Sequence, residues 1–473
     1  MRDRAAPTPC LRPSAPAARA DRLPDAAAAA DQDGGTAGGM GGAAPPAAAG
    51  IVPAALAGPA PLSGRAMFVL VFLPFALGHF LSSLMRTVNA TLAPQLVAAL
   101  ALTPGQLGLL TSAFFLAFAL AQLPVGIALD HWGPAKVQLP MLLLAGVGAL
   151  AFAGGDSFAQ LLVARALIGL GLGGCFMSAV KAISTWIAPA RLPSVQGYLI
   201  AVGGLGAASA TLPVRLALHY MDWRGLFLWL AAAAALIGIL TRALPPPQPP
   251  GARKMALLEA MRAVYRHPAF RETAALVLVP HTVFFGIQGL WISRWLSDVA
   301  RYSEEAVGYL LYLGMAAVIF GAIAVGMVTE WAGRRGVRPI SVAACGVALF
   351  IAVQLGFVLD WRPSYQLLSV LFTLVGTVTG IEYTIVAQSL PGALTGRAAT
   401  CLNLLIFLGA FAVQAGFGLV VGCWRPDLLG HYPAPAYQAA FAALVLLQLP
   451  GLLWFVRRRG RNPVEWVSPQ PGP

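Results

Sequence analysis

Twelve apolar blocks, each long enough to cross a lipid bilayer, follow one another along this 473-residue chain from residue 67 onward. A hydrocarbon core of about 30 Å takes roughly 20 helical residues. A helix satisfies every backbone hydrogen bond within its own segment, and none of the blocks alternates as a barrel strand does, so we expect twelve transmembrane helices. Their expected bounds are 67–92, 104–129, 137–154, 159–182, 193–218, 224–243, 272–296, 305–329, 338–359, 364–390, 397–422 and 436–456.

The composition indicates an all-α membrane protein. Hydrophobic residues make up 58% of the chain and charged residues 10%, whereas soluble domains average about a half and a quarter. The net charge of +13 would suggest a nucleic-acid partner in a soluble protein, but we expect none here. The cysteines show no disulfide or metal spacing, and GxSxG and HExxH motifs are absent. We therefore expect no cofactor, no metal and no enzymatic activity.

A proline-rich interruption divides the predicted spans into six plus six. It opens with PPPQPP at 245–250 and continues as a basic amphipathic stretch. The residues before the first span are rich in Ala, Pro and Gly without apolar periodicity, so we expect a disordered tail there; a chain that starts at Met67 is the alternative. The expected divisions are a tail over 1–65, a bundle over 66–243, a central loop over 244–271, a bundle over 272–457 and a tail over 458–473.

Basic residues collect on one side of the predicted bilayer. With both termini in the cytoplasm, 17 of the 25 Lys and Arg residues beyond position 65 lie on the inner side. Translocating such residues is costly, which is the basis of the positive-inside rule. We therefore expect a multi-pass monomer of a bacterial-type plasma membrane, with both termini cytoplasmic and the lipid bilayer as its surroundings.

Two loops 200 residues apart repeat one pattern. Gly126, Asp130 and Gly133 lie between the second and third predicted spans. The same spacing recurs between the eighth and ninth spans, and basic residues follow each loop. Glycine allows a tight turn, and an acid there can face a helix N-terminus, where the macrodipole favours negative charge. The alternative is that the two loops are unrelated charged loops, but this explains poorly why they share one pattern at a distance of 200 residues. The second loop contributes Gly326, Glu330 and Gly333.

These motifs make the chain resemble the major facilitator superfamily from residue 67 to about 457. The first loop is similar to that family's G-x-x-x-D-R-x-G-R/K pattern, with His131 in place of Arg. Residues 165–171, RALIGLG, match R-x-x-x-G-x-G, and Asp222-Trp223-Arg224 precedes span six. The resemblance implies two pseudo-symmetric six-helix bundles that rock about a central site. It also implies a cytoplasmic gate, which we assign to Gly126, Asp130, Gly133, Lys136, Glu330, Gly333 and Arg334.

Span one carries polar residues on one helical face, at steps of three or four. Arg86 offers a planar fork for a carboxylate or phosphate, and Asn89 adds hydrogen bonds one turn further on. The string 86–94 resembles the R-x-x-N-x-x-x-A-P piece of the anion:cation symporter branch, in which this Arg binds the organic anion. We predict Arg86, Asn89 and His79 as substrate ligands. The alternative is that Arg86 extends to the lipid headgroups.

Glu382 is the only carboxylate well inside a predicted span, the tenth. Burial disfavours the charged form of a carboxyl group, so Glu382 can load and release a proton near neutrality. An offset of 206 between Gln160 and Gln366 places Glu382 about five residues from the level of Lys181, so an ion pair between them is the alternative. We predict Glu382, Lys181 and, from its place in the family motif, Arg165 as coupling residues.

Span seven carries Gln288 and Trp291, which we predict to shape a mid-membrane pocket that binds substrate. His281 on the same span can titrate near neutral pH, but a lone His in an apolar helix is more often a core residue.

Basic groups in the predicted cavity outnumber the single acid, which favours an anionic substrate. We predict a secondary transporter that carries a small organic anion together with protons. The alternatives are a proton-driven efflux antiporter of drugs or metabolites and, in a different class, a receptor that transports nothing.

Overall fold

The computed structural model describes residues 64–187, 192–246, 257–390 and 392–459, and helices make up most of these ranges. Twelve helices in the described part are long and apolar enough to cross a membrane, which confirms the predicted number of spans. The predicted N-terminal tail, except its last two residues, lies outside the described residues. So do Arg253 and Lys254 of the central loop and residues 460–473.

The helices of the first half begin at residues that suit a helix N-terminus. Thr103 and Gln106 form a capping box at the start of α4, each side chain accepting a hydrogen bond from the other's backbone N–H. Asp222 caps α10 by accepting from the N–H of Gly225 at 2.8 Å. The elements are α1 (Gly64–Met67), η2 (Phe68–Phe72), α2 (Leu73–Thr87), α3 (Asn89–Leu100), α4 (Pro104–Trp132), α5 (Pro134–Ala153), α6 (Phe158–Leu172), α7 (Cys175–Trp186), α8 (Leu192–Ser209), α9 (Leu212–Ala217) and α10 (Trp223–Ala243).

The second half follows the same plan. Ser303 and Ser364 cap α15 and α17 through side-chain oxygens that accept from backbone N–H groups three residues on. The elements are α11 (Leu257–Arg266), α12 (Pro268–Thr273), η4 (Ala274–Leu278), α13 (Val279–Gln288), α14 (Trp291–Asp298), α15 (Glu304–Gly333), α16 (Pro339–Val358), α17 (Tyr365–Gly376), η5 (Thr377–Gly380), α18 (Ile381–Ser389), α19 (Gly392–Val421) and α20 (Ala434–Arg459).

Five spans are interrupted, although the sequence predicts each as one continuous helix. Span one breaks at Val88, span four at 173–174, span five at 210–211 and span seven at 289–290, while span ten tightens into a 3-10 turn over η5. Spans one and seven also contain π-helical segments, which begin at residues 68 and 274, an offset of 206. The two halves therefore repeat in backbone irregularity as well as in sequence.

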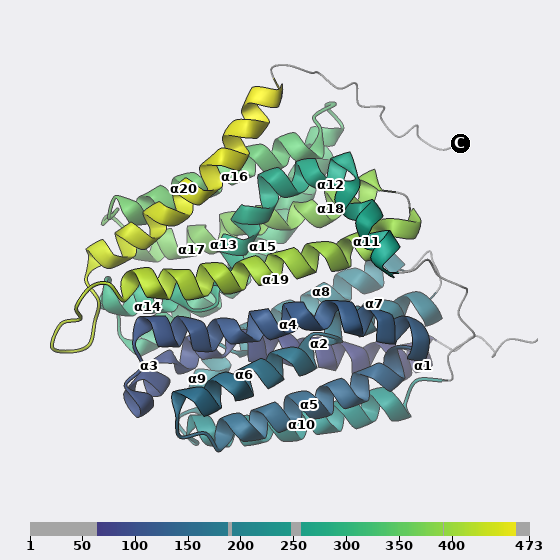
Figure 1. Cartoon of the computed structure of the whole chain (residues 1–473), viewed down its shortest axis with the longest axis horizontal. Coiled ribbons are helices and arrows are strands. Elements are labelled where there is room, and N and C mark those ends of the chain that lie inside the picture. The colour runs from purple at the N-terminus through teal and green to yellow at the C-terminus, as the bar shows by residue number, and fades with distance from the viewer. Residues whose placement is uncertain (1–63, 188–191, 247–256, 391, 460–473) are drawn as a thin grey trace, which may run out of the picture. The chain divides into compact units, whose positions relative to one another are not determined.

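The two halves meet along α4 and α19, which lie side by side (Figure 1). In the first half, α5 contacts α6 and α10, and α2 contacts α8. In the second half, α16 contacts α17 and α20, and α13 contacts α19. This arrangement agrees with two helical bundles, while their predicted bounds at residues 66–243 and 272–457 stay a prediction.

Two glycines of the R-x-x-x-G-x-G motif allow α6 to approach its neighbours closely. A Cβ atom at Gly169 would lie 2.4 Å from the carbonyl oxygen of Phe114 in α4. A Cβ atom at Gly171 would lie 2.4 Å from the amide nitrogen of Ala145 in α5. Small residues let membrane helices pack through their backbones, so these two glycines hold span four against spans two and three.

Candidate functional site

Arg86 lies in the last turn of α2, beside the interruption of span one. Its guanidinium lies over the ring of Phe285 in α13, 5.0 Å from the ring centroid, so this contact joins the two halves. Cations are attracted to the face of an aromatic ring, but a ring does not satisfy the N–H donors of a guanidinium. Among the described residues, no acceptor is hydrogen-bonded to that guanidinium. Arg86 therefore faces the opposite half with its donors free.

Arg165 fixes the backbone at the same interruption. Its buried guanidinium donates from Nη1 to the carbonyl oxygen of Met85 at 2.7 Å and from Nη2 to that of Arg86 at 3.2 Å. The last carbonyls of a helix lack partners within the helix, so a basic side chain there is stabilising. The guanidinium also lies 5.0 Å from the ring centroid of Phe114. Arg165 thus positions the helix end that carries Arg86, and its predicted coupling role stays a prediction.

Glu382 is paired with His281. The Nδ1 atom of His281 lies 2.6 Å from Oε1 of Glu382, and the two side chains are 4% and 0% exposed. A hydrogen bond between these atoms needs a proton on one of them. The other oxygen, Oε2, is buried without a hydrogen-bond partner among the described residues. The alternative ion pair between Glu382 and Lys181 is wrong for this structure, because Lys181 is bonded to Asp130.

The ring of Phe285 contacts both the free cation and the His–Glu pair. Its centroid lies 5.0 Å from Cζ of Arg86 and 5.1 Å from the centroid of the His281 ring. Tyr383 meets the His281 ring edge-on at 6.0 Å and donates its hydroxyl hydrogen bond to Oδ1 of Asn403. A group that displaced Phe285 from Arg86 would therefore disturb the surroundings of His281.

The other predicted ligands of span one face their own half. The Nδ2 group of the buried Asn89 donates to Oγ1 of Thr111 at 3.4 Å. The ring of His79 lies 5.0 Å from that of Phe176 and against Gly203, where a Cβ atom would come within 2.3 Å of Nε2. Asn89 Oδ1 and His79 Nδ1 are buried and unpaired among the described residues. A direct role of either residue in substrate binding stays a prediction.

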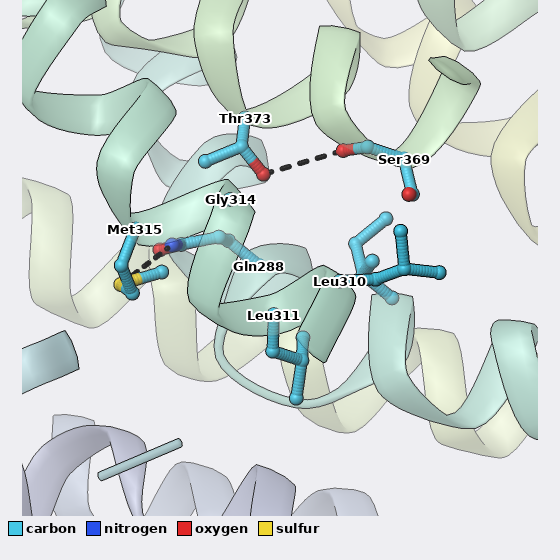
Figure 2. A pocket seen from close by; sticks show the side chains of 8 residues that line it. Gln288, Leu310, Leu311, Gly314, Met315, Ser369 and Thr373 are labelled. Carbon is cyan, nitrogen blue, oxygen red and sulfur yellow. Dashed lines mark hydrogen bonds between the residues drawn. The ribbon is translucent and has the colours of Figure 1, made fainter. Parts of the chain in front are cut away.

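Gln288 and Trp291 line two different cavities, and their shared role in binding substrate stays a prediction. Figure 2 shows Gln288 directed at Met315, with Nε2 3.6 Å from Sδ, beside a cavity of about 10 Å³. That volume holds about one water molecule. Trp291 donates to the carbonyl oxygen of Gln414 at 3.0 Å and lines a separate cavity of about 260 Å³. The interruption at 289–290 separates α13, which ends at Gln288, from α14, which begins at Trp291.

One end of the helices, which we name the Asp130 end, is held by a cluster of three charges. Lys181 Nζ lies 2.8 Å from Asp130 Oδ1, and Arg397 of α19 donates to Oδ2. All three side chains are less than one-fifth exposed. Gly133 turns the chain after α4 at φ 79, a conformation that favours glycine, and Gly126 lies near Arg397. Asp130 therefore joins the two halves.

The second copy of the loop forms no such cluster among the described residues. Glu330 accepts from Arg334 at 2.6 Å, one turn along the same helix, and both side chains are exposed. Lys136 is exposed and forms no ion pair with a described residue. Gly333 is the last helical residue, and the left-handed turn falls on Gly336 at φ 75. No contact of Glu330, Gly333 or Arg334 with the other half is found among the described residues, so their gating role stays a prediction.

Different residues join the halves at the opposite end, which we name the Glu304 end. Arg215 of α9 forms an ion pair with Glu304 of α15. Ser293 of α14 donates to the carbonyl oxygen of Ala90 in α3 at 3.1 Å. Contacts between the halves are therefore present at both ends in this structure.

The sequence identifies neither Arg397 as a partner of Asp130 nor His281 as the partner of Glu382. At the offset of 206, Arg397 aligns with Arg191, so the internal repeat could have marked it. The same offset aligns His281 with a phenylalanine, so no repeated pattern could have marked that residue. Among the described residues, no group of three His, Cys, Asp or Glu side chains could hold a metal ion.

Comparison with protein families gives one match over most of the chain. The family described as the Major Facilitator Superfamily matches residues 75–414. A Cupriavidus necator protein described as a probable sulfoacetate transporter is 27% identical over 49% of this chain and 56% of that protein, so the chain spans little more than half of this relative. The hexuronate transporter of Bacillus subtilis is 25% identical over 68% of this chain and 78% of that protein.

Solved structures share the fold at lower identity. A bacterial homolog of the human lysosomal transporter Spinster, in an inward-facing and occupied conformation, superimposes with a TM-score of 0.69 at 16% identity, over 83% of this chain and 96% of that chain. A D-xylose–proton symporter superimposes with a TM-score of 0.63 at 13% identity, over 81% of this chain and 95% of that chain. These likenesses establish the fold.

Proposed function

The chain belongs to the major facilitator superfamily, and we propose that it is a secondary active transporter which carries a small organic anion together with protons. In this fold, two bundles rock against each other so that each end of the helices opens in turn. Several relatives are described as transporters of organic anions, including sulfoacetate, galactonate and hexuronate. The unpaired positive charge of Arg86, at the contact between the two halves, also favours an anionic solute.

The observation that carries the proposal is the free guanidinium of Arg86. A cation within a membrane span is costly unless it is paired or solvated, yet Arg86 has a ring as its neighbour and no hydrogen-bond acceptor among the described residues. A carboxylate or sulfonate oxyanion would accept two parallel hydrogen bonds from the planar fork. Arg165 holds the backbone of Arg86 and so limits the positions that the fork can take.

The proton site of the proposal is the pair of His281 and Glu382. Its short hydrogen bond holds one proton between two buried side chains, and the unpaired Oε2 of Glu382 can accept a second. Phe285 contacts both the cation and the His281 ring. An anion that binds Arg86 would displace this ring, and the change in packing and charge around His281 would favour uptake of the proton.

Alternating access then requires that the contacts at the two ends break in turn. We propose that the Asp130 end faces the cytoplasm, as the distribution of basic residues indicates, and that the cluster of Asp130, Lys181 and Arg397 closes this end. The ion pair of Arg215 with Glu304 would close the opposite end. A bacterial-type plasma membrane and a monomeric state remain part of the proposal.

The substrate role of Arg86 is tested by Arg86→Lys, which keeps the charge and removes the planar fork. The loss of a charge-assisted hydrogen bond is worth about 1.5–3 kcal/mol, or roughly ten- to hundredfold in transport rate at low substrate. Uptake of labelled sulfoacetate, galactonate and hexuronate would be measured in proteoliposomes, with and without a pH gradient. Arg362→Lys, at an exposed arginine outside the spans, is the control and should leave uptake unchanged.

Wild-type uptake by Arg86→Lys would remove Arg86 from the site. Absence of anion uptake in the wild type, together with proton-driven extrusion of cationic drugs, would replace the proposal by the efflux antiporter. A wild type that binds these solutes but moves none of them would support the receptor instead.

The proton role is tested by Glu382→Gln and His281→Gln, each of which removes one member of the hydrogen-bonded pair. Both variants should lose accumulation of the anion against its gradient, because the proton no longer moves with it. Exchange of labelled for unlabelled anion across the membrane should continue. Accumulation that keeps its dependence on the pH gradient in both variants would exclude the pair as the coupling site.

A further inference from the structure

A second cavity lies at the Glu304 end, apart from the contacts of Arg86. Its volume is about 260 Å³, far above the roughly 10–15 Å³ that one water needs and close to the lower limit of about 300 Å³ for ligand pockets. Both halves contribute to it. Leu102 and Leu107 come from the first half, while Arg294, Tyr432 and Tyr437 come from the second. The cavity therefore has room for a small molecule with a short apolar body.

The carboxylate of Asp298 holds the wall of this cavity together by contacts with four other residues. Its side chain is 0% exposed and contacts Arg294 Nη2 at 3.1 Å, the hydroxyl of Tyr437 at 2.7 Å and His431 Nδ1 at 3.2 Å. The backbone N–H of Tyr432 donates to the same carboxylate at 3.3 Å. A carboxylate has about four acceptor positions. These four contacts leave Asp298 little capacity to accept from a ligand.

Two residues of the wall, Arg294 and Tyr432, carry hydrogen-bond donors without a partner among the described residues. Arg294 uses only Nη2 for Asp298, and its Nε and Nη1 groups have no acceptor among the described residues. The hydroxyl of Tyr432 also lacks a partner among the described residues. Burial raises the pKa of Tyr432 above its ordinary value, so this hydroxyl keeps its proton at neutral pH. Free donors next to a guanidinium suit an oxyanion.

We propose that this cavity is a second, outer binding site for a small organic anion, in which Arg294 and Tyr432 hold the carboxylate or sulfonate group. The apolar body of the anion packs against Leu102 and Leu107. The inference rests on the proposed function in one respect, since the anion held here is taken to be the one that Arg86 binds next. Arg294 lies nine residues beyond Phe285 along span seven, so an anion would pass from Arg294 inward to Arg86.

The test uses an anionic thiol reagent as the ligand itself. Leu102→Cys places a thiol in the cavity wall, in a background where Cys10 and the exposed Cys345 and Cys423 are replaced by Ser. The purified full-length protein is treated with 2-sulfonatoethyl methanethiosulfonate and, separately, with the cationic 2-(trimethylammonium)ethyl analogue. Rates are measured over a range of concentrations and divided by those of a free thiol. A reagent that first binds reversibly gives a rate that saturates with concentration.

With Arg294 intact, the anionic reagent should saturate and the cationic one should not. Arg294→Gln should abolish saturation and slow the anionic reagent at least tenfold at low concentration. Tyr432→Phe leaves the backbone contact to Asp298 in place and should raise the half-saturating concentration two- to fivefold. Arg362→Gln removes one positive charge at an exposed position away from the cavity lining and should change nothing, which separates a site from long-range attraction.

A linear rate for the anionic reagent with Arg294 intact would overturn the proposal, as would a thiol that neither reagent modifies. The proposed transport function is tested independently. Arg86→Gln should leave the saturation unchanged, because Arg86 does not line this cavity. Saturation in a protein that transports no anion would leave the outer site standing and refute the proposed function. Anion transport by a protein whose reaction rate does not saturate would support the proposed function and refute the outer site.

Discussion

Replacing Asp130 by Asn should open the Asp130 end of the molecule. Two partners of Asp130 are printed among the described residues, Lys181 and Arg397. Lys181 belongs to the same half as Asp130 and stays nearby when the halves separate, so its contribution largely cancels between the closed and open states. Arg397 belongs to the other half, and its contact exists only in the closed state. A hydrogen bond between charged groups contributes about 1.5–3 kcal/mol. We take the lower part of that range, about 1.5–2 kcal/mol, because each side chain is nearly one-fifth exposed and the separated ions regain water.

That loss corresponds to a shift of roughly ten- to thirtyfold in the equilibrium between closed and open states. It can be measured by electron spin resonance between labels at Trp132 and Val337, two exposed residues in different halves at this end. The Asn variant should add a population with a longer distance. Glu330→Gln is the matched control, since it neutralises the corresponding acid of the second loop, whose partner Arg334 lies on the same helix.

Equal distance distributions in Asp130→Asn and Glu330→Gln would contradict this prediction. The effects of Asp130→Asn and Arg397→Gln should also be non-additive. Arg397→Gln removes the same contact as Asp130→Asn, so the double variant should shift the equilibrium no further than either single one. Additive shifts would mean that Asp130 and Arg397 act on closure through separate partners.

Two further predictions concern the Glu304 end. In Gly418→Ala, the added methyl group would lie 2.5 Å from the carbonyl oxygen of Pro104, so we expect a loss of about 1–3 kcal/mol, seen as a lower midpoint of thermal unfolding. Gly416→Ala, which meets nothing within 4 Å, should keep the wild-type midpoint, and equal losses in both variants would contradict this. The hydrogen bond from Arg301 lowers the pKa of Asp427 to about 2. A lowered pKa in the folded state stabilises the loop above the ordinary value of about 4 and loses that effect as pH falls toward 2. Hydrogen exchange of the loop amides, corrected for the intrinsic rate, should therefore increase between pH 4 and pH 2, and Arg301→Gln should move this change to higher pH.

Hydropathy predicted the twelve spans because the bilayer sets the length of each apolar block. It could not predict where the spans are interrupted, since hydropathy reports the polarity of side chains and not the path of the backbone. Gly289 lies at the break in span seven, where a glycine weakens the helix. The break in span one falls at Val88, with neither glycine nor proline within five residues of it in the chain. Its cause is tertiary, and the buried Arg165 supplies part of it by binding the carbonyls of the last helical turn.

The partners of buried charges were predicted less well than the charges themselves. An ionisable residue within a membrane span is energetically costly, which marks it as a functional candidate whatever its partner is. Glu382 could therefore be found from the sequence alone. Its partner depends on how far two helices are shifted along each other. The alignment of repeats gives the level of Glu382 only relative to span four, where it suggested Lys181. The true partner, His281, lies on span seven, whose position relative to span ten is set by packing.

The internal repeat also explains why the anion and proton sites of the proposal lie in different halves. At the offset of 206, Arg86 aligns with Ile292, so the second half has no counterpart of the cation. His281 aligns with Phe75, so the first half has no counterpart of the His–Glu pair. Each half therefore holds only one of the two chemistries, and rocking of the halves must change the distance between them. Phe285 is the ring that spans this boundary. Coupling then needs no separate signal pathway, because any movement that separates Arg86 from Phe285 also alters the environment of the proton.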